Sequence, residues 1–180
     1  MSTSQPALAQ KPQGEGLHKP LRICFVCSGN TCRSPMAEAV ANHIEALRLQ
    51  QLPPAIRPLI PPRWEAFSAG MYATEGEPIA PNAVRALEDA EILPAKFRDY
   101  HQHEAHCLTE EEAERYDLLI GMTRAHAMKL MIRYPHLTQK IIAMPQDISD
   151  PYGGTEKHYA LCLEHIRNGV EQLLAGGDAP

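Results

Sequence analysis

The feature that most constrains the fold of this chain is a strand-like run followed closely by a helical pattern. The short loop between the two carries reactive side chains. Residues 21–26 are apolar almost throughout and predict a buried parallel strand. A helix is expected to follow, with Ser34 as its cap, Pro35 at its first position and an end near Leu49. A turn from strand to helix directs backbone N–H groups toward one point at the helix N-terminus, so it favours a bound anion.

The residues in this turn indicate covalent phosphoryl transfer. Cys27 stands first in it, and Arg33 follows six residues later. The N–H groups, the helix dipole and the guanidinium all favour a thiolate, and an arginine can hold two phosphate oxygens at once. Gly29 and Asn30 tolerate the positive φ that a tight concave loop requires. An ordinary buried cysteine is the alternative, but it leaves the glycine, the asparagine and the arginine unexplained.

The stretch resembles the signature loop of the low-molecular-weight protein phosphatases, Cys-x-Gly-Asn-x-Cys-Arg-Ser-Pro-x-Ala-Glu. All nine fixed positions are filled, by Cys27, Gly29, Asn30, Cys32, Arg33, Ser34, Pro35, Ala37 and Glu38. The resemblance implies a cysteine-dependent protein phosphatase that works through a phosphocysteine intermediate. It implies that phosphate is bound by Ser28, Gly29, Asn30, Thr31, Cys32, Arg33 and Ser34. Cys27 and Cys32 are also a candidate redox pair, because they lie five residues apart in one curved loop.

A second block of residues supplies the acid that the chemistry needs. Asp150, in Asp150-Pro151-Tyr152, matches the family's Asp-Pro-aromatic block and is expected to act first as acid and then as base. Asp147, three residues earlier, is the competing carboxylate and is assigned to the turn. Tyr152 is expected to line the mouth of the pocket. No metal or cofactor is expected, because Arg33 and the backbone supply the positive field.

Two positions separate the branches of the family. Thr31 stands where tyrosine-directed members usually carry a larger aliphatic residue, and Tyr152 is followed by glycine where those members usually have a second aromatic residue. Both features resemble the protein-arginine phosphatases, so phosphoarginine in proteins is the expected substrate and phosphotyrosine the alternative.

A thiol arsenate reductase ranks lower, because it needs cysteines that pass on a disulfide, and Cys107 and Cys162 have no clear partner. A binding module without catalysis is disfavoured by the intact Cys27, Arg33 and Asp150.

Composition and termini exclude several other classes. A net charge of −5 argues against nucleic acid as a partner, and no apolar run reaches the length of a membrane span. Residues 1–19 are polar, lack the apolar core of a signal peptide and predict a disordered leader before a phosphatase domain over residues 20–180. Five cysteines without an export signal indicate reduced thiols in a cytoplasmic protein. The sequence gives no oligomeric state.

Strands that alternate with helices predict a four-stranded parallel sheet with helices on both faces. The expected strands are residues 21–26, 64–68, 116–121 and 140–144, and the later helices are 83–90, 110–114, 124–133 and 156–174. Thr109 and Glu112 have the spacing of a capping box, and residues 52–63 form a proline-rich insertion expected to be extended. Since sites in such sheets lie beyond the carboxyl ends of the strands, the loop with Asp150 should be able to reach Cys27.

Two patterns suggest a metal without matching a defined site. Cys24 and Cys27 are three apart, but on a strand they point to opposite faces. Histidines gather at His101, His103 and His106, with His126 later, and their spacing fits no metal motif. The family often has His-x-Ala-Arg at this point, whereas this chain has His103-Glu104-Ala105-His106, so a histidine stands in place of that arginine.

Overall fold

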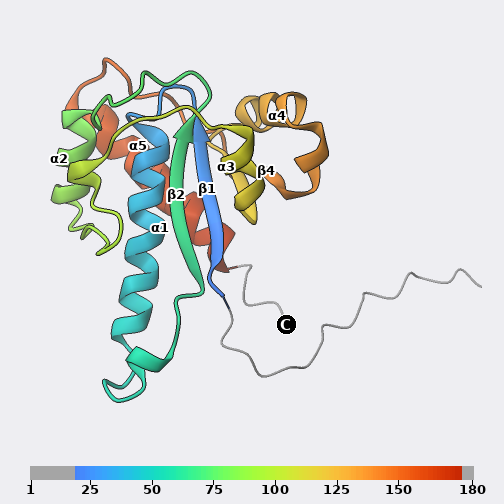
Figure 1. The fold of residues 1–180 in the computed structure, drawn as a ribbon. Coiled ribbons are helices and arrows are strands. Elements are labelled where there is room, and N and C mark those ends of the chain that lie inside the picture. The colour runs from blue at the N-terminus through green and yellow to red at the C-terminus, as the bar shows by residue number, and fades with distance from the viewer. Residues whose placement is uncertain (1–18, 176–180) are drawn as a thin grey trace, which may run out of the picture.

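The computed structural model describes residues 19–175. Four strands within this range form one parallel sheet in the order β2-β1-β3-β4 (Figure 1). The strands are β1 (Leu21–Cys27), β2 (Trp64–Gly70), β3 (Leu118–Gly121) and β4 (Ile141–Ala143). The helices are α1 (Arg33–Gln50), α2 (Pro81–Asp89), α3 (Glu110–Arg115), α4 (Arg124–Arg133) and α5 (Glu156–Ala175). The predicted α/β class and parallel sheet are therefore confirmed, with several element ends shifted by one or two residues.

The sheet divides the core into two layers. Side chains of α1, α2 and α5 pack with Ile23 and Phe25 of β1, while α3 and α4 pack with Cys24 and Val26 on the other face (Figure 1). Every residue of β1 from Ile23 to Cys27 is buried, because neighbouring strands flank β1 and helices cover both of its faces. Cys24 and Cys27 lie in opposite layers, as the strand geometry predicted, so they cannot share a metal.

Helix α1 begins two residues earlier than expected, at Arg33, with Cys32 at the N-cap. The prediction that Ser34 caps this helix is wrong. Its hydroxyl lies instead 3.0 Å from the Cys27 sulfur and 3.4 Å from the carbonyl oxygen of Ala69. Because Ser34 is inside the helix, its side chain faces the preceding loop and not the free N–H groups of the first turn.

The proline-rich insertion is more compact than the extended connector that was predicted. It contains a short 3-10 helix, η1 (Arg57–Leu59), and the Arg57 guanidinium donates to the carbonyl oxygens of Gln50 and Leu52 at 2.7 and 3.0 Å. The segment is therefore folded back on the end of α1. The predicted leader falls almost wholly outside the described residues, and so do Gly176 and Gly177, where the last helix was expected to end.

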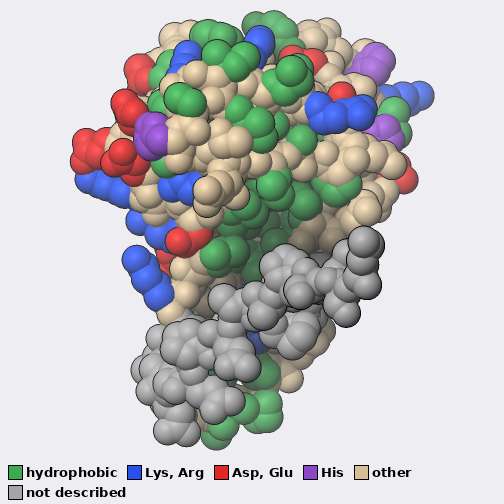
Figure 2. Space-filling model, turned by 90° about the vertical axis from the view of Figure 1, so that its right-hand side faces the viewer, with side chains coloured by type: hydrophobic (Ala, Val, Ile, Leu, Met, Phe, Trp, Pro, Cys, Tyr) green, Lys and Arg blue, Asp and Glu red, His purple; other side chains and the backbone are tan. Residues whose placement is uncertain are grey.

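The molecule is viewed from its α4 side in Figure 2, where hydrophobic side chains gather near the centre and charged ones lie mainly around them. Strand β4, an edge of the sheet, has only three residues, which keeps the row of unpaired backbone groups short. Within residues 19–175, no helix is long and apolar enough to cross a membrane.

Candidate active site

The loop at the carboxyl end of β1, residues 27–34, is called the cysteine loop here. Cys27 ends β1 and is almost fully buried, with 2% of its surface exposed. Its sulfur accepts a hydrogen bond from the Asn30 backbone N–H at 3.3 Å and lies 3.0 Å from the Ser34 hydroxyl. These donors stabilise a negative charge on the sulfur, as a nucleophilic thiolate requires.

Asn30 holds the cysteine loop in shape. Its φ of 56° lies in the left-handed region, which asparagine adopts more readily than most residues. The side-chain nitrogen donates to the hydroxyls of Ser34 and Ser68 at 3.0 and 3.1 Å, and the side-chain oxygen accepts from the His106 backbone N–H at 3.1 Å. His103 Nε2 donates to the Asn30 carbonyl oxygen at 2.7 Å. Of the two residues expected to tolerate positive φ, Asn30 adopts it and Gly29 does not.

A second layer of polar groups lies behind Asn30. Because the Ser68 hydroxyl accepts from Asn30, it donates in turn to the Glu38 carboxylate, at 2.6 Å. Glu38, the last fixed position of the signature, is buried and paired with Arg98, whose Nε lies 2.7 Å away. The carboxylate is therefore fully partnered despite its burial.

Arg33 and Asp150 meet across the pocket, although they lie 117 residues apart. Arg33 donates to Asp150 at 2.6 Å and to the carbonyl oxygen of Ile148 at 3.3 Å. The Arg33 side chain is 8% exposed and that of Asp150 is 51% exposed, so the arginine is fixed while the acid faces solvent. The buried Nε of Arg33 has no hydrogen-bond partner among the described residues. A buried N–H of this kind suits an oxyanion of a bound phosphate.

A hollow of about 270 Å³ opens over the sulfur of Cys27, and we call it the cysteine pocket. Its lining is made by Cys27, Ser28, Gly29, Asn30, Thr31, Cys32, Arg33, Glu77, Asp150 and Tyr152. The structure thus brings together the predicted nucleophile, arginine, acid and two specificity positions. Asp147, the competing acid, is not in this lining, and it accepts from the Arg124 backbone N–H at 2.8 Å.

His126 lies behind the cysteine pocket, and its position there was not foreseen from the sequence. One ring nitrogen, Nε2, is 3.0 Å from the Ser28 hydroxyl, and the other, Nδ1, is 2.8 Å from the Thr123 hydroxyl. Burial, with the positive charge of Arg33 and Lys129, lowers the pKa of His126 to about 4. The ring is therefore neutral near pH 7 and positions Ser28 without adding charge.

Cys32 lies beneath the loop. Its sulfur is 3.3 Å from the Tyr159 hydroxyl on α5, and burial raises the pKa of this thiol. Cys32 is therefore protonated near neutral pH and is a packed, buried thiol in this structure. Its role as a resolving thiol stays a prediction.

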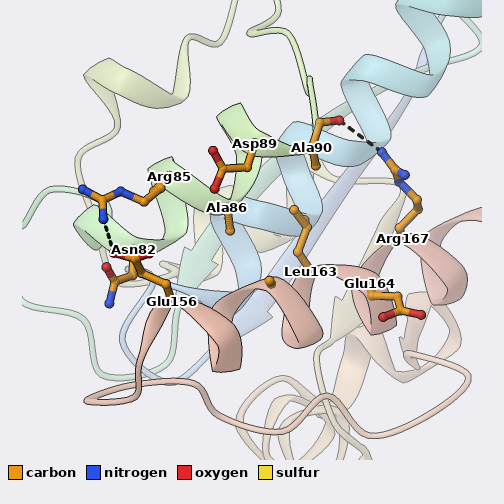
Figure 3. Close-up of a pocket in the computed structure, with 10 residues that line it drawn as sticks. Asn82, Arg85, Ala86, Asp89, Ala90, Glu156, Leu163, Glu164 and Arg167 are labelled. Atoms are coloured by element: carbon orange, nitrogen blue, oxygen red, sulfur yellow. Dashed lines mark hydrogen bonds and ion pairs between the residues drawn. The ribbon is translucent and has the colours of Figure 1, made fainter.

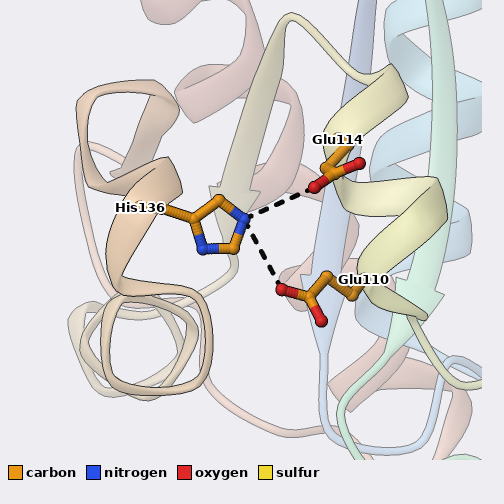
Figure 4. A group of neighbouring side chains, drawn as sticks. All are labelled: Glu110, Glu114 and His136. Carbon is orange, nitrogen blue, oxygen red and sulfur yellow. Dashed lines mark ion pairs between the residues drawn. The ribbon is translucent and has the colours of Figure 1, made fainter.

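None of the four histidines singled out in the sequence belongs to a group of three metal-ligating side chains within residues 19–175. His101 contacts Asp99 and Glu88, and burial lowers the pKa of His103. A different cluster, Glu110, Glu114 and His136, places three ligand atoms together (Figure 4). All three side chains are exposed, and the His136 ring lies 3.5 and 3.6 Å from the two carboxylates, which is the arrangement of a surface ion pair.

A second hollow, of about 250 Å³, lies between α2 and α5 (Figure 3). Arg85 pairs with Glu156 at one end, and Arg167 approaches the Ala90 carbonyl oxygen at the other. Its lining contains neither a cysteine nor a histidine, whereas that of the cysteine pocket contains Cys27 and Cys32.

Comparison with known proteins agrees with this geometry. The family model described as low molecular weight phosphotyrosine protein phosphatase matches residues 22–178. A protein-arginine-phosphatase of Geobacillus stearothermophilus is 30% identical over 161 residues, which cover 86% of this chain and 94% of that protein. A probable low molecular weight protein-tyrosine-phosphatase EpsP of Ralstonia nicotianae is 31% identical over 153 residues, or 83% of this chain and 90% of that protein.

The similarity extends to solved structures. A structure of the YwlE arginine phosphatase, a cysteine-to-serine mutant with a phosphorylated active-site serine, superimposes with a TM-score of 0.71 at 28% identity. The match covers 87% of this chain and 95% of the other.

Proposed function

The chain belongs to the low molecular weight phosphotyrosine protein phosphatase family, and from that premise we propose that it hydrolyses phosphoarginine in proteins. It is a cysteine-dependent phosphoprotein phosphatase of the hydrolase class, and its family needs no metal. The observation that carries the arginine assignment is Thr31, a small hydroxyl residue in the pocket lining where a larger aliphatic residue would favour a phenol ring. We also propose a cytoplasmic location, which the five free thiols support.

In the first step, the Cys27 thiolate attacks phosphorus and forms a sulfur–phosphorus bond. The phosphorus–nitrogen bond breaks, and its electron pair goes to the arginine nitrogen. Asp150 donates a proton to that nitrogen, which suits an acid that is half exposed at the pocket mouth. The free Nε of Arg33 and the backbone N–H groups of the loop hold the phosphoryl oxygens as negative charge spreads over them.

In the second step, water attacks phosphorus and the sulfur–phosphorus bond breaks. Asp150, now ionised, accepts the proton from water, and the released electron pair returns to sulfur. The Ser34 hydroxyl, 3.0 Å from that sulfur, can donate to the departing thiolate. Inorganic phosphate and the original thiolate remain.

Phosphotyrosine is the second candidate substrate, because several relatives carry the name protein-tyrosine-phosphatase. Tyr152 lies at the pocket mouth with 74% of its surface exposed, and it offers one aromatic wall. The residue that follows it is Gly153, so a second wall is missing at that position. A single wall gives less stacking on a phenol ring and leaves more room for a planar guanidinium.

Parallel kinetics on phosphoarginine and phosphotyrosine peptides of the same sequence test the proposal. The wild-type protein should have the higher kcat/KM on phosphoarginine. Replacing Thr31→Ile should lower that value at least tenfold, equivalent to about 1.4 kcal/mol, while phosphotyrosine hydrolysis holds or rises. Thr31→Ser, which keeps the hydroxyl, is the matched control and should retain the preference.

A wild-type preference for phosphotyrosine would refute the arginine assignment, as would an equal loss of both activities in Thr31→Ile. Cys27→Ser should abolish turnover while phosphate still binds. If this variant kept more than about a thousandth of the wild-type rate, the covalent mechanism would be wrong.

A further inference from the structure

We infer that Glu77 is a specificity-determining residue whose carboxylate binds the positively charged guanidinium group of the substrate. This inference rests on the proposed function, because phosphoarginine brings a cation into a pocket that otherwise receives only an anion. Glu77 lies outside the signature loop and outside the block that contains Asp150.

Glu77 is in the lining of the cysteine pocket, on the segment that follows β2. Its backbone is fixed on both sides: its carbonyl oxygen accepts from the Ala105 N–H at 2.8 Å, and its N–H donates to Thr74 at 3.3 Å. Three residues later, the Ala80 N–H donates to the carbonyl oxygen of Thr31 in the cysteine loop at 2.8 Å. The position of Glu77 relative to the loop is therefore set by backbone bonds.

The charges of the pocket lining make this residue unexpected for a phosphate site. Arg33 is the one cationic residue in the lining, and it already pairs with Asp150. Within residues 19–175, no hydrogen bond or ion pair holds the Glu77 side chain, which is exposed. A phosphate dianion on a neutral phenol would only be repelled by this carboxylate.

A phosphoarginine side chain reverses that effect. Its guanidinium carries positive charge and several N–H donors beside the phosphoryl group, and carboxylates bind such a group through paired hydrogen bonds. Asp150 has its own task at the leaving nitrogen, so Glu77 is the carboxylate left to bind the cation. The opposing interpretation is a solvated surface carboxylate with no part in recognition.

The test separates recognition of a cation from the chemistry of the phosphorus–nitrogen bond. Two phosphate esters are compared, para-(guanidinomethyl)phenyl phosphate and para-methylphenyl phosphate. Only the first carries a cationic group. Glu77→Gln should lower the ratio of their kcat/KM values by about fivefold to tenfold, the range of one partly exposed charge-assisted hydrogen bond. Glu77→Lys should lower it further.

Glu104→Gln is the matched control. Glu104 lies opposite Pro78 in a short bridge beside Glu77, is exposed and carries the same charge, but it does not line the cysteine pocket. This variant should change the ratio by less than about twofold, because an exposed charge at a distance is largely screened. An equal effect of Glu77→Gln and Glu104→Gln would show only a general field effect and would overturn the inference.

Peptide substrates distinguish failure of the inference from failure of the proposed function. If the wild-type protein prefers phosphoarginine peptides but Glu77→Gln leaves the ester ratio unchanged, the inference is wrong and the function stands. If the wild-type protein prefers phosphotyrosine peptides while Glu77→Gln still lowers the ester ratio, the arginine assignment falls and cation recognition by Glu77 stands.

Discussion

Replacing Asn30 should destabilise the protein strongly. The size of the effect should depend on how readily the new residue adopts the left-handed backbone conformation of Asn30. The side chain is fully buried and makes three hydrogen bonds, to Ser34, Ser68 and the His106 backbone N–H. At about 1 kcal/mol for each bond, Asn30→Gly should lower the free energy of unfolding by about 3 kcal/mol. Asn30→Ala should lose about 1 kcal/mol more, because alanine resists the left-handed conformation that glycine adopts freely.

Asn42 provides the matched control, since it is also a buried asparagine. It makes two hydrogen bonds to the backbone of Ala66, but it lies inside α1. In a helix the order of the two replacements reverses, and Asn42→Gly should be about 1 kcal/mol less stable than Asn42→Ala. The two sites therefore predict opposite signs for the same alanine-to-glycine difference.

Urea unfolding of the four variants measures these free energies, and the midpoint of thermal unfolding provides a second estimate. A loss of about 4 kcal/mol in Asn30→Ala corresponds to a fall of roughly 8–16 °C for a domain of this size. The reasoning is refuted if Asn30→Gly and Asn30→Ala have equal stability. It is also refuted if both stay within about 1 kcal/mol of the wild-type protein.

Three further outcomes are expected. Asp150→Asn should slow hydrolysis of a poor leaving group far more than that of para-nitrophenyl phosphate, since only the poor one needs a proton; equal losses would show that Asp150 is not the acid. Peroxide should inactivate the wild-type protein reversibly, with rescue by thiol, whereas Cys32→Ala should be oxidised irreversibly at Cys27; unchanged rescue would exclude Cys32 as the resolving thiol. Because the pKa of His126 is lowered to about 4, its neutral form contributes stability above pH 6.5 that is lost as the pH falls toward 4. The midpoint of urea unfolding should fall less between pH 6.5 and pH 4 in His126→Gln than in the wild-type protein. An identical dependence on pH in the two proteins would refute the assignment of this effect to His126.

The parts of the site that are contiguous in sequence were predictable. Cys27 and Arg33 lie in one short loop, and the parallel sheet then places Asp150 at the same edge, because it follows the carboxyl end of β4. The capping box of Thr109 and Glu112 was equally readable, since it depends on residues three apart and is present in the structure.

The rest depends on contacts between distant segments, which one sequence does not reveal. Ser68, His126 and Glu77 come from three separate parts of the chain, and each reaches the cysteine loop only through tertiary packing. The cap of α1 was misassigned for a related reason. Ser34 has the side chain of a good cap, but its hydroxyl is directed to the Cys27 sulfur, and the helix begins one residue before it.

The network around Asn30 has a consequence for the order in which the protein is made. All residues of the signature leave the ribosome within the first 38 positions, but the groups that shape the loop come from Ser68 and His106, and the acid comes from Asp150. At 5–20 residues per second, the interval between Cys27 and Asp150 lasts roughly 6–25 s. During that interval the loop around Cys27 lacks the residues that hold it in its folded conformation. The nucleophile of this protein is therefore synthesised well before the residues that complete its active site.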